Sequence, residues 1–438
     1  MCSTTQENLI TIEIQKKMIS KFLLNDKNIK RNTFFWNAFS AMMNSFQTMV
    51  LLLLITRTGT DTDSSIFVMA YAIGNLVLNV GKYGVRQYQV TDVQEQCKFR
   101  DYLRARYASM VFMFVSIFLY VGYNVMNHSY SATKAIVVVG ICMVKAVESF
   151  EDVFHGRIQQ KGRLDVAGRV LGVRLFIFVL GYGITYIVTK NLIFTTILNL
   201  GITVLVAIFL NTIAFQSFRD DGKSAGKGSV KRVLIECLPL CICMCLNMYI
   251  ANAPKYIIDT IVSDEVQTRF NIVFMPVFVI ALLATFIFQP YLKRLGEMWI
   301  TRDVKKFVKT IINFSLVVLI IDLVITLVGS FIGGPILGMI YGVSLKSYNH
   351  YLIVFMLAGG IIALQNLFIM VVTTVRYQKF MIYGYSITAL ILFLFGKKIL
   401  TGNGLFALCI FFLAMLTFLT LYCIALIVVA IKRESENR

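Results

Sequence analysis

Twelve apolar stretches, separated by short polar segments, constrain what this chain of 438 residues can fold into. A helix needs roughly 20 predominantly apolar residues to cross a bilayer, and most of these stretches have about that length. Hydrophobic residues make up 58% of the chain, and mean hydropathy is +0.74. Charged residues make up 15%, whereas soluble domains contain about 25%. The sequence therefore predicts an all-α polytopic membrane protein.

The predicted spans are approximately 33–55, 65–85, 107–126, 135–154, 170–189, 192–215, 234–257, 266–291, 307–329, 351–375, 380–395 and 405–431. The stretch 380–395 is short for a span. We expect it to run on through Lys397 and Lys398, because long basic side chains can extend to the membrane interface.

The basic residues between the spans predict the orientation. Thirty-two of the 42 Lys and Arg residues lie on the side of the N-terminus, and seven lie on the other side. Because loops rich in Lys and Arg stay in the cytoplasm, we expect both termini to be cytoplasmic. The formal net charge of +19 is spread over these loops and does not form a basic domain, so no nucleic-acid partner is expected.

The basic segment 219–232 separates six spans from six. An even number of spans in each half gives both halves the same orientation, as in parallel internal repeats. We therefore expect two six-helix lobes around a central cavity. The expected division is a cytoplasmic N-terminal segment 1–32, an N-terminal lobe 33–218, a cytoplasmic linker 219–232, a C-terminal lobe 233–431 and a cytoplasmic tail 432–438.

The span 135–154 carries charges that a lipid-facing helix would not tolerate. Lys145, Glu148, Asp152 and His155 follow one another at helical spacing, and Glu151 lies beside them. A charge near the bilayer centre costs about 2.5–3.5 kcal/mol on insertion scales, so this face must meet water, a polar partner or a substrate. The alternative is a structural charge cluster that joins two helices.

Further polar residues lie inside or at the ends of other spans, and Lys255 and Asp259 form an i, i+4 pair in the seventh. If transport is coupled to protons or Na⁺, the candidate residues for that coupling are Glu148, Asp259 and Asp322. The predicted substrate-binding residues are Arg86, Lys145, Glu148, Glu151, Asp152, Arg174, Asn247, Asn252, Lys255 and Asp259. Of these, Lys145, Glu148, Asp152 and Arg174 are expected to line the inner wall of the first lobe.

Patterns typical of soluble enzymes do not occur in the sequence. It contains no HExxH motif, no nucleophile elbow and no Cys/His metal-binding spacing. The glycines of the middle loop lack the upstream glycine of a phosphate-binding loop. We therefore expect no catalytic residues, no metal and no cofactor, apart from a coupling proton or Na⁺.

The mixture of cations and carboxylates indicates a kind of cargo. Lys and Arg suit phosphate oxygens, while carboxylates and asparagines suit sugar hydroxyls. A lipid-linked glycan with a pyrophosphate offers both groups. Residues 150–168 (FEDVFHGRIQQKGRLDVAG) resemble the fourth-helix region of bacterial polysaccharide flippases, the Wzx-like group of the multidrug/oligosaccharidyl-lipid/polysaccharide exporter (MOP) superfamily. Residues 81–92 (GKYGVRQYQVTD) and 252–259 (NAPKYIID) are similar to second- and seventh-helix segments of that group.

The resemblance implies a MATE-like fold of two lobes, a cationic central cavity and alternating access. It implies export of undecaprenyl-pyrophosphate-linked oligosaccharide repeat units for capsule, exopolysaccharide or O-antigen synthesis. The expected location is the bacterial cytoplasmic membrane. The expected partners are this substrate, membrane lipids and other polysaccharide-assembly membrane proteins, and the transporter itself is expected to be a monomer.

Three other functions remain open. A multidrug exporter of the same superfamily would share the fold, but it would usually carry organic cations, which a cationic cavity repels. A peptidoglycan-precursor flippase usually has two additional helices. A glycan polymerase or ligase would be expected to have a large extracellular loop, whereas the outer loops here are short.

Overall fold

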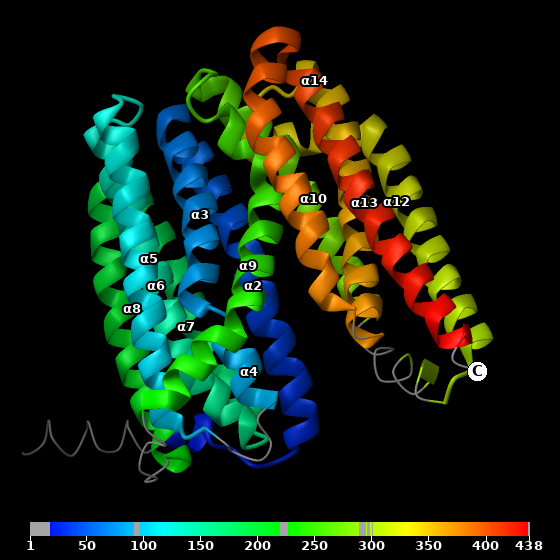
Figure 1. Cartoon of the computed structure of the whole chain (residues 1–438). Helices are drawn as coiled ribbons and strands as arrows, with labels where there is room; N and C mark the ends of the chain where they lie inside the picture. Colours follow the sequence, from blue (N-terminus) through cyan, green and yellow to red (C-terminus); the bar gives the residue numbers. More distant parts are fainter. Residues whose placement is uncertain are drawn as a thin grey trace, which may run out of the picture. The chain divides into compact units, whose positions relative to one another are not determined.

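The computed structural model of the chain describes residues 18–91, 97–219, 227–288, 295, 298–299, 301–375 and 377–436. All regular structure in these ranges is helical, and no strand occurs within them (Figure 1). The predicted all-α class is therefore confirmed.

The chain divides into two compact units. Unit 1 comprises Met1–Ile55 and Ile73–Cys241, and unit 2 comprises Thr56–Ala72 and Ile242–Arg438. The lobes expected from the sequence differ from these units at two places, residues 56–72 and 233–241. Local contacts account for both: Ser65 of the first segment donates to Asp264 of unit 2 at 2.8 Å, and Cys237 of the second packs in a core cluster of unit 1. Half of the expected linker, residues 220–226, lies outside the described residues.

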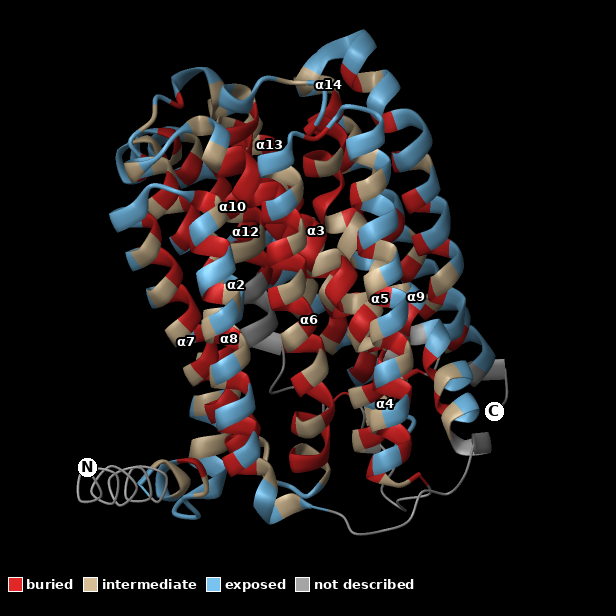
Figure 2. Ribbon diagram, turned by 90° about the vertical axis from the view of Figure 1, so that its left-hand side faces the viewer, coloured by how far each residue is buried: buried red, intermediate tan, exposed pale blue. Residues whose placement is uncertain are grey.

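In unit 1, α6 is the central helix. It packs against α4, α5, α7 and α8, and 17 of its residues are buried (Figure 2). The outward turns of α5 and α8 are exposed and apolar, which suits contact with lipid. The helices of unit 1 are α2 (Ile29–Thr58), the end of α3 (Asp61–Lys82), α4 (Val85–Thr91), α5 (Phe99–Met126), α6 (Ala132–Gln160), α7 (Leu164–Thr189), α8 (Leu192–Phe215), the 3-10 helix η1 (Gln216–Phe218) and the start of α9 (Lys227–Ile258).

In unit 2, α13 has the central position, because α10, α12 and α14 all pack against it. Small residues of α12 allow close packing on α13: a Cβ added at Gly333 would lie 2.9 Å from the Leu352 side chain. The helices of unit 2 are the start of α3, the end of α9, α10 (Asp264–Phe288), α12 (Val304–Tyr341), the 3-10 helix η3 (Lys346–Tyr348), α13 (Asn349–Thr374) and α14 (Gln378–Glu436).

Polar residues in the short connections define where helices begin. Ser131 Oγ accepts from Lys134 N at 3.2 Å before α6, and Asn191 Oδ1 accepts from Phe194 N at 3.0 Å before α8. Each bond satisfies one backbone N–H that the first helical turn leaves without a partner. These caps let α5–α6 and α7–α8 follow one another through very short turns.

A single glycine divides α14 into two helices. Gly404 has φ 84° and ψ 179°, a conformation open to glycine because it has no Cβ. Figure 1 shows the result as two rods, orange and red, that meet at a bend. The predicted spans 380–395 and 405–431 lie on either side, and the first continues through Lys397 and Lys398 as predicted.

In the described residues, nine helices are long and apolar enough to cross a membrane. α6 and α10, which have 29 and 25 residues, come in addition, and α14 contains two spans. Each of the twelve predicted spans therefore coincides with a helix over its described residues. Large apolar side chains cover the exposed surfaces, for example Leu323 and Phe331 of α12, as expected of a surface that contacts lipid.

Candidate functional site

The ionisable side chains that the sequence singles out on α6 lie in the interior of unit 1. Lys145, Glu148, Glu151, Asp152 and His155 are each at most 7% exposed. The sequence predicted one polar face, but the polar groups leave α6 on two sides. One set meets α7 and α8, and the other meets α4 and α5. We call these residues, together with their partners described below, the unit 1 charge network.

Glu148 has three cationic partners. Its carboxylate accepts from Lys82 Nζ at 3.0 Å and from Lys145 Nζ at 3.3 Å, and Arg174 Nη2 lies 3.8 Å away. The three cations come from α3, α6 and α7. Glu148 therefore ties three helices together at one buried point.

Glu151 faces the other two helices. Its Oε1 accepts from Arg174 Nε at 2.6 Å, and its Oε2 accepts from Asn211 Nδ2 of α8 at 3.1 Å. Arg174 thus lies between two carboxylates one turn apart on α6. This bridge makes Glu148 and Glu151 parts of a single network.

Asp152 binds two guanidinium groups. Arg86 Nη1 of α4 lies 3.2 Å from one carboxylate oxygen, and Arg106 Nη2 of α5 lies 3.0 Å from the other. Arg86 also donates to Gln159 Oε1 at 3.0 and 2.8 Å, which holds its planar group between two positions of α6.

A glycine allows Arg106 to reach this position. Arg106 is buried and donates to the carbonyl of Gly81 and, at 3.4 Å, to Ser149 Oγ. A Cβ added at Gly81 would lie 2.5 Å from both Met113 Sδ and Ser149 Oγ. Since real Cβ atoms do not approach so closely, α3 can pack here only with glycine.

The network holds five cations and three carboxylates, a formal excess of two positive charges. Its ion pairs join α6 to α3, α4, α5 and α7, so the structural role considered from the sequence is present. Removing one partner of a buried pair typically costs about 3–5 kcal/mol, because the other charge stays buried without compensation. The ion pairs that join the helices do not account for the two surplus positive charges.

Exposure divides the five cations into two groups. The side chains of Lys82 and Arg86 are 25% and 26% exposed, whereas those of Arg106, Lys145 and Arg174 are at most 2% exposed. Among the cations of the network, Lys82 and Arg86 are therefore the accessible ones in this conformation. Lys145 and Arg174 are held in the interior by Glu148 and Glu151.

The candidates of the seventh span lie in unit 2. Lys255 is buried, with Nζ 5.1 Å from the ring centre of Phe274 and 4.9 Å from that of Phe278. Such cation–π contacts stabilise a desolvated ammonium group. Asn252 is also buried and donates to Met248 O at 3.1 Å, whereas Asn247 is exposed.

The predicted i, i+4 pairing of Lys255 with Asp259 on one helix is wrong. α9 ends at Ile258, so Asp259 falls in the following turn. Its Oδ1 accepts from Gln267 Nε2 of α10 at 3.1 Å. Helical spacing across a helix end does not predict contact.

Asp322 of α12 is 5% exposed, and its Oδ1 has no hydrogen-bond partner among the described residues. No ion pair involves it in that part of the chain. The carboxyl group packs against Gly360 of α13, where a Cβ would overlap it. Asp322 therefore occupies a niche that glycine leaves open.

The sequence does not identify three members of the network. Lys82 and Arg106 belong to the excess of basic residues on the cytoplasmic side, and Asn211 falls within a predicted apolar span. Nearness in the sequence is the one signal that relates Lys82 to Arg86, because Lys82 ends α3, Arg86 lies in α4, and the chain turns between them at Tyr83 and Gly84. No such signal marks Arg106, because α5 begins at Phe99, about two turns before the predicted span.

No group of three His, Cys, Asp or Glu residues in the described ranges is placed to hold a metal ion. The cysteines of α9 include Cys237, packed in an apolar core cluster, and Cys241, whose Sγ lies 3.9 Å from Asn79 O.

Comparison with known proteins identifies the fold. An inward-facing multidrug resistance MATE family transporter of the MOP superfamily superposes with a TM-score of 0.63 at 12% identity, over 90% of this chain and 95% of that one. The Vibrio cholerae MATE transporter VcmN, as a single-residue mutant, gives 0.61 at 11% identity over 94% and 98%. A MOP superfamily transporter from Pyrococcus furiosus, described as having a binding pocket of reverse polarity that suggests a different function, gives 0.57 at 14% identity over 95% and 98%.

No protein-family model matches the chain, and no curated protein matches its sequence. At these identities the structural likeness shows the fold, which is that of MATE transporters of the MOP superfamily, as predicted.

Proposed function

We propose that this chain is a transporter of the bacterial cytoplasmic membrane that moves undecaprenyl-pyrophosphate-linked oligosaccharides across it by alternating access. The product of this step would supply capsule, exopolysaccharide or O-antigen synthesis. The observation that carries the proposal is the excess of cations over carboxylates in the unit 1 charge network, with Lys82 and Arg86 as its accessible members.

The charge of the network favours an anionic cargo. Two uncompensated positive charges in a desolvated setting repel an organic cation and attract a pyrophosphate. The guanidinium of Arg86 offers a planar pair of donors to phosphate oxygens, and Lys82 adds a point charge. Both residues keep their carboxylate partners paired with another cation if they turn toward a ligand: Asp152 retains Arg106, and Glu148 retains Lys145.

The fold supports a transporter, and the alternative cargo comes from the same comparison. Solved transporters with this fold include multidrug resistance proteins, so a multidrug exporter is the second candidate. The Pyrococcus furiosus protein is a precedent for a member with a pocket of reverse polarity and a different function. The cationic network of this chain supports a cargo other than an organic cation.

Asp322 is the most suitable of the three coupling candidates. Glu148 is held by three cations and Asp259 accepts from Gln267, whereas no described cation pairs with Asp322. A carboxyl group in an apolar niche can change its protonation without breaking an ion pair. We therefore propose that Asp322 carries the coupling proton, if transport uses a proton gradient.

Reconstitution tests the cargo. The full chain in liposomes is expected to move a lipid-linked oligosaccharide with a pyrophosphate group, measured by access of an added glycosidase or lectin. The double variant Lys82→Gln/Arg86→Gln should lower the rate by about tenfold or more, because each charge-assisted hydrogen bond contributes roughly 1.5–3 kcal/mol. Arg232→Gln, which removes an exposed cation paired with Glu236 at 3.1 Å, is the control and should leave the rate unchanged.

Deletion in the native host then identifies the glycan, as the lipid-linked oligosaccharide that accumulates on the inner side. A purified protein that moves no pyrophosphate-linked glycan under any proton or sodium gradient, yet extrudes a lipophilic cation, would overturn the proposal in favour of the multidrug exporter.

A further inference from the structure

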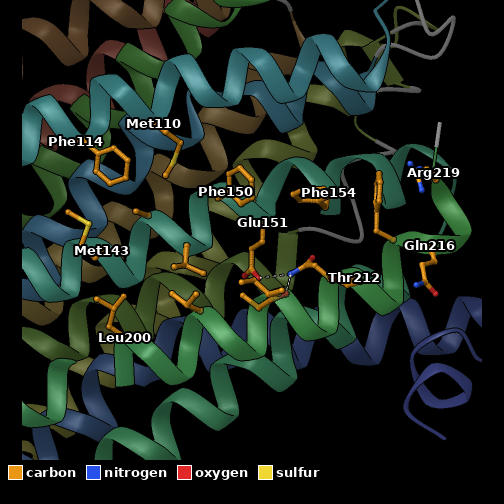
Figure 3. Close-up of a pocket in the computed structure, with 17 residues that line it drawn as sticks. Met110, Phe114, Met143, Phe150, Glu151, Phe154, Leu200, Thr212, Gln216 and Arg219 are labelled. Carbon is orange, nitrogen blue, oxygen red and sulfur yellow. Dashed lines mark hydrogen bonds between the residues drawn. The ribbon is translucent and has the colours of Figure 1, made fainter. Parts of the chain in front are cut away.

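An elongated groove in unit 1 lies between α5 and α8, with α6 as its floor (Figure 3). Its volume is about 830 Å³, and small-molecule sites range from roughly 300 to 1,000 Å³. Lys82 and Arg86, the accessible cations of the charge network, are not among its lining residues. The groove is therefore a second candidate site in this unit.

The shape and walls of the groove suit a hydrocarbon chain. Along α8 it extends from Leu200 to Phe215, which is about 22 Å at the helical rise per residue. Phe114 of α5 and Phe150 and Phe154 of α6 line it from the other helices (Figure 3). A long apolar groove of this kind fits one extended acyl chain better than a compact molecule.

One end of the groove is polar and basic. Gln216 and Arg219 stand there, at the end of α8 (Figure 3). This is the side of the membrane on which most Lys and Arg residues are expected from the sequence. A guanidinium at the interface binds a phosphate group, and a basic surface attracts anionic lipids. The two ends of the groove thus match the two parts of an anionic phospholipid.

The floor connects the groove to the charge network. Glu151 and Asn211 both line it, and the hydrogen bond between them is drawn in Figure 3. Because Arg174 already matches the charge of Glu151 at 2.6 Å, the floor does not favour a lipophilic cation. A chain lying over this pair would keep water away from it and so strengthen its hydrogen bond.

From these features we infer that the groove binds an acyl chain of an anionic phospholipid, with the lipid phosphate at Arg219, and that the bound lipid shields the Glu151–Asn211 pair. The site does not depend on the identity of the cargo, so it stands or falls separately from the proposed function.

Photo-crosslinking of the unaltered protein tests the position of the chain. The full chain in nanodiscs is exposed to phosphatidylglycerol that carries a photoreactive group in one acyl chain. Adducts are expected on α5, α6 and α8 around Phe114, Phe150 and Phe215, and unlabelled phosphatidylglycerol should compete for them while phosphatidylcholine should not. Adducts distributed evenly over exposed helices such as α12 would show ordinary lipid contact and overturn the proposal.

Variants then test the two ends of the site by native mass spectrometry of retained lipid. Arg219→Gln should lower retention of phosphatidylglycerol about tenfold, as expected for the loss of a charge-assisted hydrogen bond. Thr212→Trp places bulk on an exposed lining position of α8 and should have a similar effect. Lys190→Gln and Leu205→Trp change the same properties outside the groove and should leave retention unchanged.

Two results obtained with folded variants would contradict this assignment. Equal losses in the control variants would mean that the groove has no special role. Displacement of phosphatidylglycerol by a polyprenyl phosphate or by tetraphenylphosphonium, at equal concentration, would assign the groove to one of those molecules instead.

Discussion

α6 and α13 are the central helices of their units, but they are built from different residues. α6 buries six Lys, Arg, His, Asp and Glu side chains, whereas α13 contains no Lys, Arg, Asp or Glu between Asn349 and Thr374. α6 is joined to its neighbours by ion pairs. α13 is joined to its neighbours by close packing at glycines such as Gly360. The same position in a helical unit can thus be held by two kinds of contact.

The buried charged side chains of the two units also differ in the groups that they contact. In unit 1 each carboxylate of α6 has cationic partners. Because partners are shared between carboxylates, a change at one member of the unit 1 charge network affects the others. In unit 2, Lys255 lies over two phenylalanine rings and Asp322 lies against a glycine. Removing a charge from a set leaves others uncompensated, whereas neutralising an isolated buried charge removes a desolvation cost.

We expect the largest loss of stability when a carboxylate of the unit 1 charge network is neutralised. Glu148→Gln leaves Lys82, Lys145 and Arg174 with one carboxylate fewer, and we expect it to lower the free energy of unfolding by about 3–5 kcal/mol. Asp322→Asn, the matched change in unit 2, should alter stability by less than about 1 kcal/mol. Thermal unfolding of both variants in the same detergent measures the difference. Equal losses of stability would mean that the two carboxylates are held in the same way.

An intermediate effect is expected from the niche at Gly360. Gly360→Ala introduces a Cβ that overlaps the Asp322 carboxyl group, and overpacking of this kind typically costs about 1–3 kcal/mol. Asp322→Ala in the same chain should restore most of the loss, a coupling that a double-mutant cycle measures. Gly201→Ala, where a Cβ meets nothing within 4 Å, is the control. Additive losses in the double variant would show that the two residues do not share the niche.

The smallest effect is expected at Lys255. Lys255→Met keeps most of the length of the side chain and removes the ammonium group, so a desolvation cost and a cation–π contact are lost together. The net change in stability should be within about 1 kcal/mol. Lys145→Met, at a buried lysine of the set in unit 1, should cost clearly more. A larger loss of stability in Lys255→Met than in Lys145→Met would mean that Lys255 takes part in ion pairs that stabilise unit 2.

A transport assay can test whether Asp322 carries a coupling proton. In proteoliposomes, Asp322→Asn should abolish any dependence of transport on an imposed proton gradient while leaving movement down a substrate gradient. Asp259→Asn serves as the control, because the Asp259 carboxylate accepts from Gln267 Nε2. Retention of the gradient dependence in Asp322→Asn would remove Asp322 as the coupling residue.

Most of the fold could be predicted from the sequence. Twelve apolar stretches gave twelve helices, because backbone groups in lipid can be satisfied only within a helix and the bilayer sets its length. The misplaced start of α5 has a physical reason. Residues 99–106 are polar and basic, so hydropathy assigns them to a loop, yet they extend the helix because Arg106 finds buried partners on Asp152 and Gly81.

The site could be predicted in part. The sequence singled out α6, Arg86 and Arg174, because charges inside apolar spans are conspicuous by position alone. It could not assign partners: Arg174 meets Glu148 and Glu151, and Asp259 meets Gln267, through contacts between helices that sequence spacing does not encode. It also could not separate the partly exposed Lys82 and Arg86 from the buried Lys145 and Arg174.

By itself, then, the sequence determined which segments are helices in a membrane and which helix carries the charges, since both follow from the cost of exposing polar groups to lipid. The tertiary structure decided which charges pair, which remain accessible and where a groove is left between α5 and α8. These depend on how side chains from different helices fill the space between them, and a one-dimensional pattern holds no record of that packing.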